Sequence, residues 1–355
     1  MDNGQFRSRS RAQGGANRKI GTKAFRVLLL ASISLVIAVV LMLITGHITQ
    51  VLPGEQAAQR WRGVGDGNFA QVSAFFPRYR TLTASDITAM TSSMRHTLDT
   101  DGFSPDEGDF AYAYSGEGVL TLSTARGEVE ARAFGIGGNF FLFHPVRLIS
   151  GAGWDDSSIN RDIVLLSESA AWDLFGALDI AGQTLMLDGQ TLVVAGVYRP
   201  YGDFATQAAL DVLPHIFLPY EMLSQHETAP VTALYVIAPN PLSHFAAGLV
   251  QDVVEERDFE EGTYHLMENS ARYRLGARFS IAGQFGRRSM QQMGLQLPPW
   301  ENSARMTEDY VALLLIFTLF FLILPLLATV VILFRIGRHL KQKAKRSIEK
   351  RRLPS

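Results

Sequence analysis

The sequence VLLLASISLVIAVVLMLITG, residues 27–46, decides the fold class of this chain, together with YVALLLIFTLFFLILPLLATVVILF, residues 310–334. Neither stretch contains a charged residue. At about 1.5 Å per residue, a helix over the first stretch spans about 30 Å, the thickness of the hydrocarbon core of a bilayer. The second stretch is long enough for a tilted span, and Pro325 in its interior predicts a kink. We therefore expect two transmembrane helices.

Two other interpretations fit these stretches poorly. A cleaved signal peptide has an apolar region of about 7–15 residues, followed by a small-x-small cleavage site. Residues 27–46 are longer than that, and residues 47–50 read HITQ. A core helix of a soluble protein that is as apolar as residues 310–334 would be unusual.

Charge is distributed unevenly along the chain. The net charge is −1, but residues 1–26 carry +6, residues 335–355 carry +8 and the stretch between them carries −15. Because basic residues flank membrane helices on the cytoplasmic side, we expect both tails in the cytoplasm and residues 47–309 outside the cell membrane. The tails are then expected to contact anionic lipid, which we favour over nucleic-acid binding. They are too short to hold an ATPase domain.

Residues 47–309 have the pattern of a mixed α/β domain. A linker is expected over 51–68, and apolar spacing predicts a helix over 86–98, with Thr83 or Ser85 as its N-cap. Further helices are predicted over 167–175 and 243–256. Strands are predicted from alternating or β-branched residues at 110–114, 118–123, 128–134, 163–166, 184–187, 192–197 and 233–237.

Turn residues separate these strands. Turns are predicted at Ser115-Gly116, Arg126-Gly127 and Asp188-Gly189, and Gly176 suits the end of the helix before it. Gly196 inside a strand predicts a bulge or a close backbone approach. We expect two lobes. Residues 110–200 should form much of one, and the helices near 86–98 and 243–256 should belong to the other.

Several short motifs follow one another in the middle of the chain. They are Gly137–Phe141, Leu148–Gly151, Ile163–Leu166, Ala171–Gly176, Ile180–Gly182, Leu187–Gly189, Val193–Val197 and Phe217–Tyr220. In this order, between two apolar spans, they resemble the periplasmic core domain of MacB-type ABC transporters, of the FtsX/MacB permease class. The resemblance is close over about 65 residues and loose over about 200. It implies an external domain with two lobes.

The chain departs from that family in two respects. Gly151-Ala152-Gly153 stands where the family usually has Gly-Arg, and two spans stand where its permeases have four. The chain also has no Gly-x-x-x-x-Gly-Lys-Ser/Thr phosphate-binding loop. The resemblance therefore implies a two-span, non-catalytic membrane subunit of a MacB-like transport or mechanotransmission complex, with a separate ABC ATPase and a companion permease as partners.

Residues for catalysis or metal binding are scarce. The chain has no cysteine, which excludes disulfides and thiolate metal sites, and its eight histidines lack His-x-x-x-His or His-Glu-x-x-His spacing. No Gly-x-Ser-x-Gly elbow is present, and Ser167 reads as a helix start rather than a nucleophile. Trp172 and Phe175 are expected in the core rather than in a ligand site. We predict no catalytic, cofactor-binding or metal-binding residue and no cofactor.

Two charged stretches leave their roles open. Residues 255–261 are mostly acidic but lack the spacing of a calcium loop, so we expect a solvated surface. Five arginines lie just before the second span and could pair with acidic residues, contact lipid headgroups or dock a partner: Arg272, Arg274, Arg278, Arg287 and Arg288.

The function expected first is therefore that of a non-catalytic transporter subunit. A membrane-anchored extracytoplasmic receptor or binding module without an ATPase is the alternative, and a membrane-tethered hydrolase is a third. A co-purifying ATPase would separate the first from the second, and a deep pocket with convergent polar groups would favour the third.

Overall fold

The structure is a computed structural model that describes residues 5–50, 52–61, 67–105, 108–154, 158, 160–200, 204–209, 213–260, 262–284 and 295–352. The chain divides into two compact units. One is Thr49–Asp309, and the other consists of Met1–Ile48 with Tyr310–Ser355. The side of a membrane on which each unit lies stays a prediction.

In the described part of the larger unit, a ten-stranded sheet forms the framework: nine strands follow the order β10-β1-β9-β2-β3-β8-β5-β7-β4, and β6 pairs with β2 and β7 beside this path. The strands are β1 (Phe69–Phe75), β2 (Ala111–Thr124), β3 (Gly127–Gly138), β4 (Arg147–Gly151), β5 (Ile163–Ser167), β6 (Thr184–Leu187), β7 (Gln190–Arg199), β8 (His215–Pro219), β9 (Val231–Pro239) and β10 (His265–Glu268). The pairs β3/β8 and β5/β7 are parallel, and the other pairs are antiparallel.

Helices cover this sheet and lead into and out of it. They are α1 (Gln5–Gln50), η1 (Pro53–Glu55), α2 (Ala57–Arg60), α3 (Ala84–Thr100), α4 (Phe140–Phe143), α5 (Glu168–Phe175), α6 (Phe204–Ala209), α7 (Tyr220–His226), α8 (Phe245–Glu255), η3 (Asn269–Ala271), α9 (Leu275–Gln284) and α10 (Pro299–Arg352).

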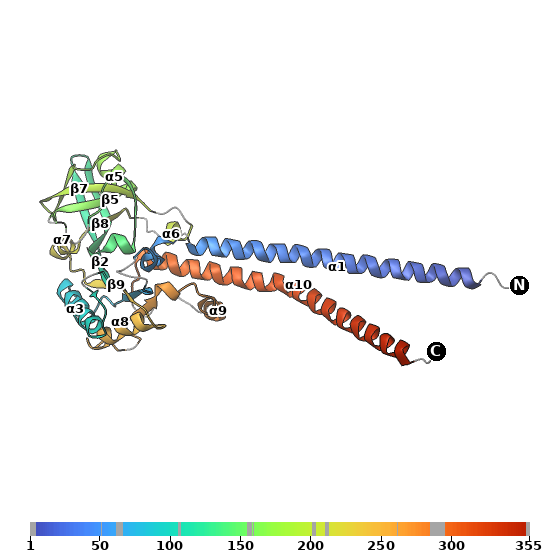
Figure 1. Ribbon diagram of the computed structural model, residues 1–355. Helices are drawn as coiled ribbons and strands as arrows, with labels where there is room; N and C mark the ends of the chain where they lie inside the picture. Colours follow the sequence, from blue (N-terminus) through green and yellow to red (C-terminus); the bar gives the residue numbers. More distant parts are fainter. Residues whose placement is uncertain are drawn as a thin grey trace. The chain divides into compact units, whose positions relative to one another are not determined.

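One lobe of the larger unit is built on β1 and β9 and is covered by α3 and α8 (Figure 1). The expected helix over 86–98 forms as α3, because Thr83 and Asp86 cap it reciprocally: Thr83 Oγ1 accepts from the Asp86 backbone N–H, and Asp86 accepts from the Thr83 backbone N–H at 2.9 Å. Its apolar face, which includes Ile87 and Met90, packs into this lobe's core. The expected helix over 243–256 forms as α8 and packs there too.

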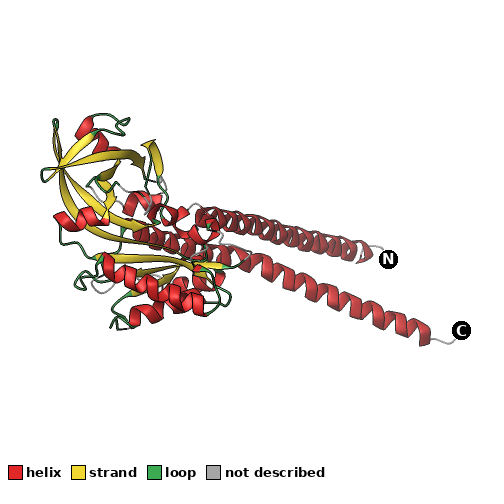
Figure 2. Cartoon of the chain, turned by 60° about the vertical axis from the view of Figure 1, so that its left-hand side comes forward, coloured by secondary structure: helices red, strands yellow, loops and turns green. Residues whose placement is uncertain are grey.

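The other lobe closes on itself. Because β6 pairs with both β2 and β7, the strands β2, β3, β8, β5, β7 and β6 form a hydrogen-bonded ring. Its core is aliphatic, with Leu122, Leu166 and Leu218 fully buried. Strand β2 is long and contributes side chains to the cores of both lobes, so one continuous sheet connects them (Figure 2). The mixed α/β fold with two lobes is confirmed.

Local sequence signals explain several turns of this lobe. Asp188 and Gly189 have φ of 49° and 87°, as the predicted tight hairpin between β6 and β7 requires. Ser167 caps α5, and Gly176 ends it with φ of 69°. Gly196 is the predicted close approach, since a Cβ there would lie 2.4 Å from the carbonyl oxygen of Ser150.

Three expectations are wrong. No turn interrupts β2 at Ser115-Gly116; the pairing with β9 shifts register there, and a Cβ on Gly116 would lie 2.7 Å from the carbonyl oxygen of Pro230. Trp172 is 51% exposed rather than part of the core, although Phe175 does pack against the core. The described part of 51–68 is not a plain linker, because it forms η1 and α2 and buries Ala57.

Among the described residues, two helices are long and apolar enough to cross a membrane, Phe25–Gln50 and Pro299–Lys345. Only 17% of the most apolar window of each is buried, which is unlike a core helix of a soluble protein. Small side chains on α1 are buried at a spacing of three, four and seven residues: Ala31, Ser34, Ala38 and Thr45. Small residues at such a seam let two membrane helices approach closely.

The proline of α10 has a specific compensation within this unit. Pro325 has no backbone N–H, so the carbonyl oxygen of Phe321 loses its helical donor. The Ser34 hydroxyl of α1 donates to that oxygen at 2.5 Å. A side chain of the neighbouring helix thus satisfies the backbone group that proline frees, as an apolar solvent requires. Helix α10 continues through Pro325, and it bends along its length (Figure 1).

Candidate functional site

The two faces of strand β1 differ in chemistry. Ala70, Val72 and Ala74 point into the core under α3 and α8. The alternate residues Gln71 and Ser73 are polar and yet fully buried, at 0% and 1% exposure. Because side chains alternate across a strand, these two point to the opposite face, where the segments next to the apolar helices lie.

Gln71 and Ser73 hold these segments through hydrogen bonds. The Gln71 side chain accepts from the Ala57 N–H at 3.0 Å and donates to the Gly54 carbonyl at 2.7 Å, which fixes η1 and α2. The Ser73 hydroxyl donates to Asn269 Oδ1 at 2.7 Å, which fixes η3. Buried polar groups of this kind are tolerated because each has a partner.

A buried ion-pair cluster joins these segments to α10. Its centre is Arg272, whose side chain has no exposed surface. Arg272 Nη2 donates to Glu301 Oε1 at 2.6 Å, Nε donates to Glu308 Oε1 at 2.6 Å, and Nη1 donates to Glu55 Oε1 at 3.1 Å. Arg305 Nε also donates to Glu301 Oε1, at 3.0 Å. The planar guanidinium thus connects η1, the segment after η3 and the first three turns of α10.

The cluster perturbs the acidity of its members in opposite directions. Burial raises the pKa of Glu55, and Arg272 only partly opposes this. Burial also acts to raise the pKa of Glu301, but the cations of Arg272 and Arg305 and the hydrogen bond from Arg272 together outweigh it, and the pKa lies below its usual value. Burial lowers the pKa of His265 to about 4, and the nearby cation of Arg305 adds to the effect. In this cluster, the effect of burial on the pKa values and the opposing effect of ion pairing are therefore of similar size.

Aromatic rings pack beside the cluster. Trp300 lies in the first turn of α10. The centroid of its ring is 5.1 Å from that of Phe134, 5.5 Å from that of Phe140 and 5.0 Å from that of His144. Its Nε1–H donates to the Tyr235 hydroxyl at 2.7 Å. Phe140 belongs to the Gly-Gly-Asn-Phe-Phe motif noted in the sequence. The motif therefore supplies part of the layer on which α10 begins.

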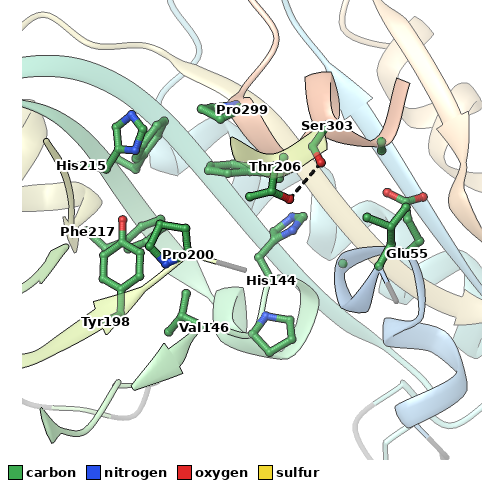
Figure 3. Close-up of a pocket in the computed structure, with 16 residues that line it drawn as sticks. Glu55, His144, Val146, Tyr198, Pro200, Thr206, His215, Phe217, Pro299 and Ser303 are labelled. Atoms are coloured by element: carbon green, nitrogen blue, oxygen red, sulfur yellow. Dashed lines mark hydrogen bonds between the residues drawn. The ribbon is translucent and has the colours of Figure 1, made fainter. Parts of the chain in front are cut away.

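A pocket of about 130 Å³ opens within this layer (Figure 3). Its walls are mostly apolar or aromatic, and they include Leu52, Phe134, Val146, Tyr198, Phe217 and Trp300. Thr206 Oγ1 and Ser303 Oγ lie 3.0 Å apart in a hydrogen bond at the pocket. His144 also lines it, and burial lowers the pKa of this histidine to about 3, so its ring is neutral at physiological pH.

The charged stretches singled out in the sequence lie in different environments. Of the five arginines, Arg272 is the centre of the buried cluster, whereas Arg274 is exposed and Arg278 donates to the carbonyl of Tyr273 at 2.7 Å. Arg287 and Arg288 lie outside the described residues. In the described part of the acidic stretch, residues 255–260, Phe259 is buried in the core and the other residues are exposed. No group of three or more potential metal ligands occurs among the described residues.

Sequence reasoning missed most of this site. Glu55 lay in the expected linker, and Glu301 and Glu308 preceded the second span without an evident role. Strand β1 was not predicted either. A usable signal existed in FAQVSAF, residues 69–75, because Gln71 and Ser73 alternate with apolar residues. That pattern ordinarily indicates a solvent-exposed face, so even this signal would not have revealed their burial.

The fold and the site together define a sheet-rich domain between two apolar helices, with a buried ion-pair cluster that joins η1, the segment after η3 and the start of α10. Among known families, the "MacB-like periplasmic core domain" matches residues 27–247. This match covers more than half of the chain, and the chain belongs to that family. No curated protein matches the sequence.

Two solved structures are similar to the chain. The periplasmic region of MacB from Actinobacillus actinomycetemcomitans has 16% identity and a TM-score of 0.41, covering 61% of this chain and 95% of that one. The extracellular domain of the noncanonic ABC-type transporter YknZ from Gram-positive bacteria has 14% identity and a TM-score of 0.38, covering 56% of this chain and all of the other. The family assignment rests on the family match.

Proposed function

We propose that the chain is a non-catalytic membrane subunit of a MacB-like ABC transporter or mechanotransmission complex. A separate ABC ATPase in the cytoplasm and a companion permease in the membrane would be its partners. The observation that carries the proposal is the buried Arg272 cluster, which ties the segment after α1 and the first turns of α10 to the same sheet. Motion of either membrane helix would then act on the sheet at one rigid point.

The chemistry of the cluster suits this role. Removing one partner from a buried ion pair leaves an uncompensated charge and is strongly unfavourable, whereas replacing all of its members together by apolar residues of similar volume would serve stability as well. Buried ion pairs are therefore best explained here by the geometry that they impose. Helix α10 is one helix from Pro299 to Arg352, so it can carry displacement along its length.

The proposal includes a topology. Both termini would be cytoplasmic and residues 47–309 extracytoplasmic, as the charges of +6 and +8 on the tails suggest. The cysteine-free chain permits a direct test. A membrane-impermeant thiol reagent should label a cysteine at the exposed Ser92 in intact cells, but not one at Ser10 or Ser347. Labelling at Ser10 with none at Ser92 would contradict the topology.

The partners are tested by recovery of the chain from native membranes. A C-terminal tag, mild detergent and mass spectrometry should return an ABC ATPase and a second permease-like chain. The matched control is the same chain carrying the tag and purified after denaturing solubilisation, which should return neither. Recovery of the chain alone in every mild detergent would contradict the proposal.

The second candidate function is a membrane-anchored receptor or binding module without an ATPase. The observation that favours it is the apolar pocket beside Trp300, since a rigid external domain with a preformed pocket can bind a ligand without a motor. Recovery of the chain alone would move the assignment to this candidate.

A further inference from the structure

We propose that the pocket lined by Phe134, Val146, Tyr198, Phe217 and Trp300 binds the acyl chain of a membrane lipid. This inference goes beyond the transport role and does not depend on it, since a receptor could use the same pocket. It rests on the chemistry of the wall, on the size of the pocket and on its place along the chain.

The wall offers an apolar ligand a favourable environment and a charged ligand none. Five of its side chains are the aromatic or aliphatic groups named above. Glu55 is the charged residue of the wall, and its two carboxylate oxygens already accept hydrogen bonds from Arg272 and Asn269. Since an apolar surface gains free energy when it leaves water, a hydrocarbon chain is the ligand class that this wall selects.

The size of the pocket excludes larger occupants. A volume of about 130 Å³ lies below the 300 to 1,000 Å³ or so that is typical of sites for drug-sized molecules. It is close to the roughly 150 Å³ of a cavity that takes up benzene. A peptide helix or a globular partner cannot enter such a space, whereas several methylene groups of a linear chain can.

The position of the pocket along the chain identifies the source of the hydrocarbon. Leu52 stands two residues after the end of α1, and Ala304 stands six residues before Tyr310, where the apolar sequence begins. Six residues of helix correspond to about 9 Å. Because the pocket residues are so close in sequence to both apolar segments, we take the lipid from the leaflet that these segments would enter.

Polar groups at the pocket could orient the polar end of the lipid. Thr206 and Ser303 contribute hydroxyl groups. The Nε2 atom of His144 is shielded from solvent and meets no hydrogen-bond partner among the described residues. Sites for apolar ligands commonly have a few such groups that fix orientation. An ester carbonyl or hydroxyl of a lipid is the matching partner for a neutral imidazole.

Photo-crosslinking tests the proposal directly. The full chain would be placed in nanodiscs of phosphatidylcholine that carries a diazirine in one acyl chain, irradiated and mapped by mass spectrometry. We expect adducts on the two apolar helices and, in addition, on peptides that contain Phe134, Tyr198 or Trp300. The helix adducts provide an internal reference for labelling efficiency.

Variants then assign the pocket adducts. Val146→Phe fills the pocket and should lower these adducts about tenfold relative to the helix adducts. Val146→Asp places a carboxylate in the wall and should have the same effect without adding bulk. Leu148→Phe is the matched control, because Leu148 is nearby but 45% exposed, and it should change nothing. Near-ultraviolet circular dichroism identifies the variants that retain the fold.

Two results would overturn the proposal. One is labelling of the wild-type chain that is confined to residues 25–50 and 310–334. The other is an undiminished pocket signal in a correctly folded Val146 variant. Neither result bears on whether an ATPase is recovered with the chain, so the transport proposal would be judged separately.

Discussion

The two faces of strand β1 are buried for different reasons. On one face, Ala70, Val72 and Ala74 pack under α3 and α8 in a core of buried apolar side chains. On the other, Gln71 and Ser73 bond to the segments that lead into the apolar helices, and Arg272 pairs with three carboxylates beside them. The first face gains stability from area removed from water. On the second face, desolvating the charged groups costs free energy, but the bonds that they form fix where the chain enters and leaves the sheet.

This difference has a functional meaning. An apolar core tolerates repacking, because hydrophobic contacts have little directionality. A guanidinium with bonds to Glu55, Glu301 and Glu308 holds one arrangement, because each bond has its own direction. Under the proposed function, a domain that receives motion from two helices needs a directional joint at their ends, and the face with the ion pairs would supply one.

The largest effect is expected from Arg272→Met. It leaves buried carboxylates without their cation and should lower the free energy of unfolding of the full chain in detergent by about 3–5 kcal/mol. Arg274→Met, two residues away and exposed, is the matched control and should stay within about 0.5 kcal/mol of wild type. Equal values for the two variants, measured by denaturant titration, would show that the cluster is not the joint described here.

On the apolar face, Met90→Ala should cost about 2–5 kcal/mol, because Met90 is fully buried under β1 and β9. Met186→Ala is the control, since Met186 is 38% exposed.

The two faces can then be compared by double-mutant cycles. Arg272→Met with Glu301→Gln should show a coupling of about 0.5–3 kcal/mol, whereas Arg272→Met with Met90→Ala should add within about 0.5 kcal/mol. Strong coupling of the second pair would erase the distinction between the faces.

The ion-pair face should also respond to pH. His265 has its pKa lowered to about 4 by burial, so the unfolded chain binds its proton more readily than the folded one. The resulting stability is complete above about pH 6.5 and is lost as pH falls toward 4, by roughly 2–3 kcal/mol. His265→Phe keeps a ring against Phe75 and should flatten this part of the pH profile. An unchanged slope in thermal unfolding between pH 6.5 and 4 would exclude His265 as its cause.

The smallest effect is expected within the helical unit. Ser34→Ala removes the hydroxyl that satisfies the Phe321 carbonyl above Pro325 and should weaken the pairing of α1 with α10 by about 0.6 kcal/mol. Ser32→Ala is the control, because Ser32 is exposed on the same helix. Cysteine pairs placed across the seam would report the pairing through their rates of disulfide formation. Equal rates in the two variants would leave the hydroxyl without a role.

Sequence patterns predicted the apolar face of the domain better than the face with ion pairs. The helix around Met90 and the hairpin at Asp188-Gly189 follow from spacing, caps and turn chemistry, all of which are local. The Arg272 cluster joins residues 55, 272, 301 and 308, and no local rule connects positions so far apart. A buried arginine and a solvated one have the same sequence context. Trp172 shows the same limit, since its apolar surroundings predicted burial and the structure exposes it.

Hydrogen exchange in the complex recovered from native membranes tests the central claim most directly. With ATP and with ATP absent, exchange would be measured across the chain for wild type and Arg272→Met. We predict that ATP changes exchange in residues 53–57, 265–275 and 299–309 of the wild type, while α3 under the apolar face stays equally protected. In Arg272→Met the ATP-dependent change should disappear from residues 53–57 and 265–275. Identical exchange with and without ATP in those three segments of the wild type would contradict the account.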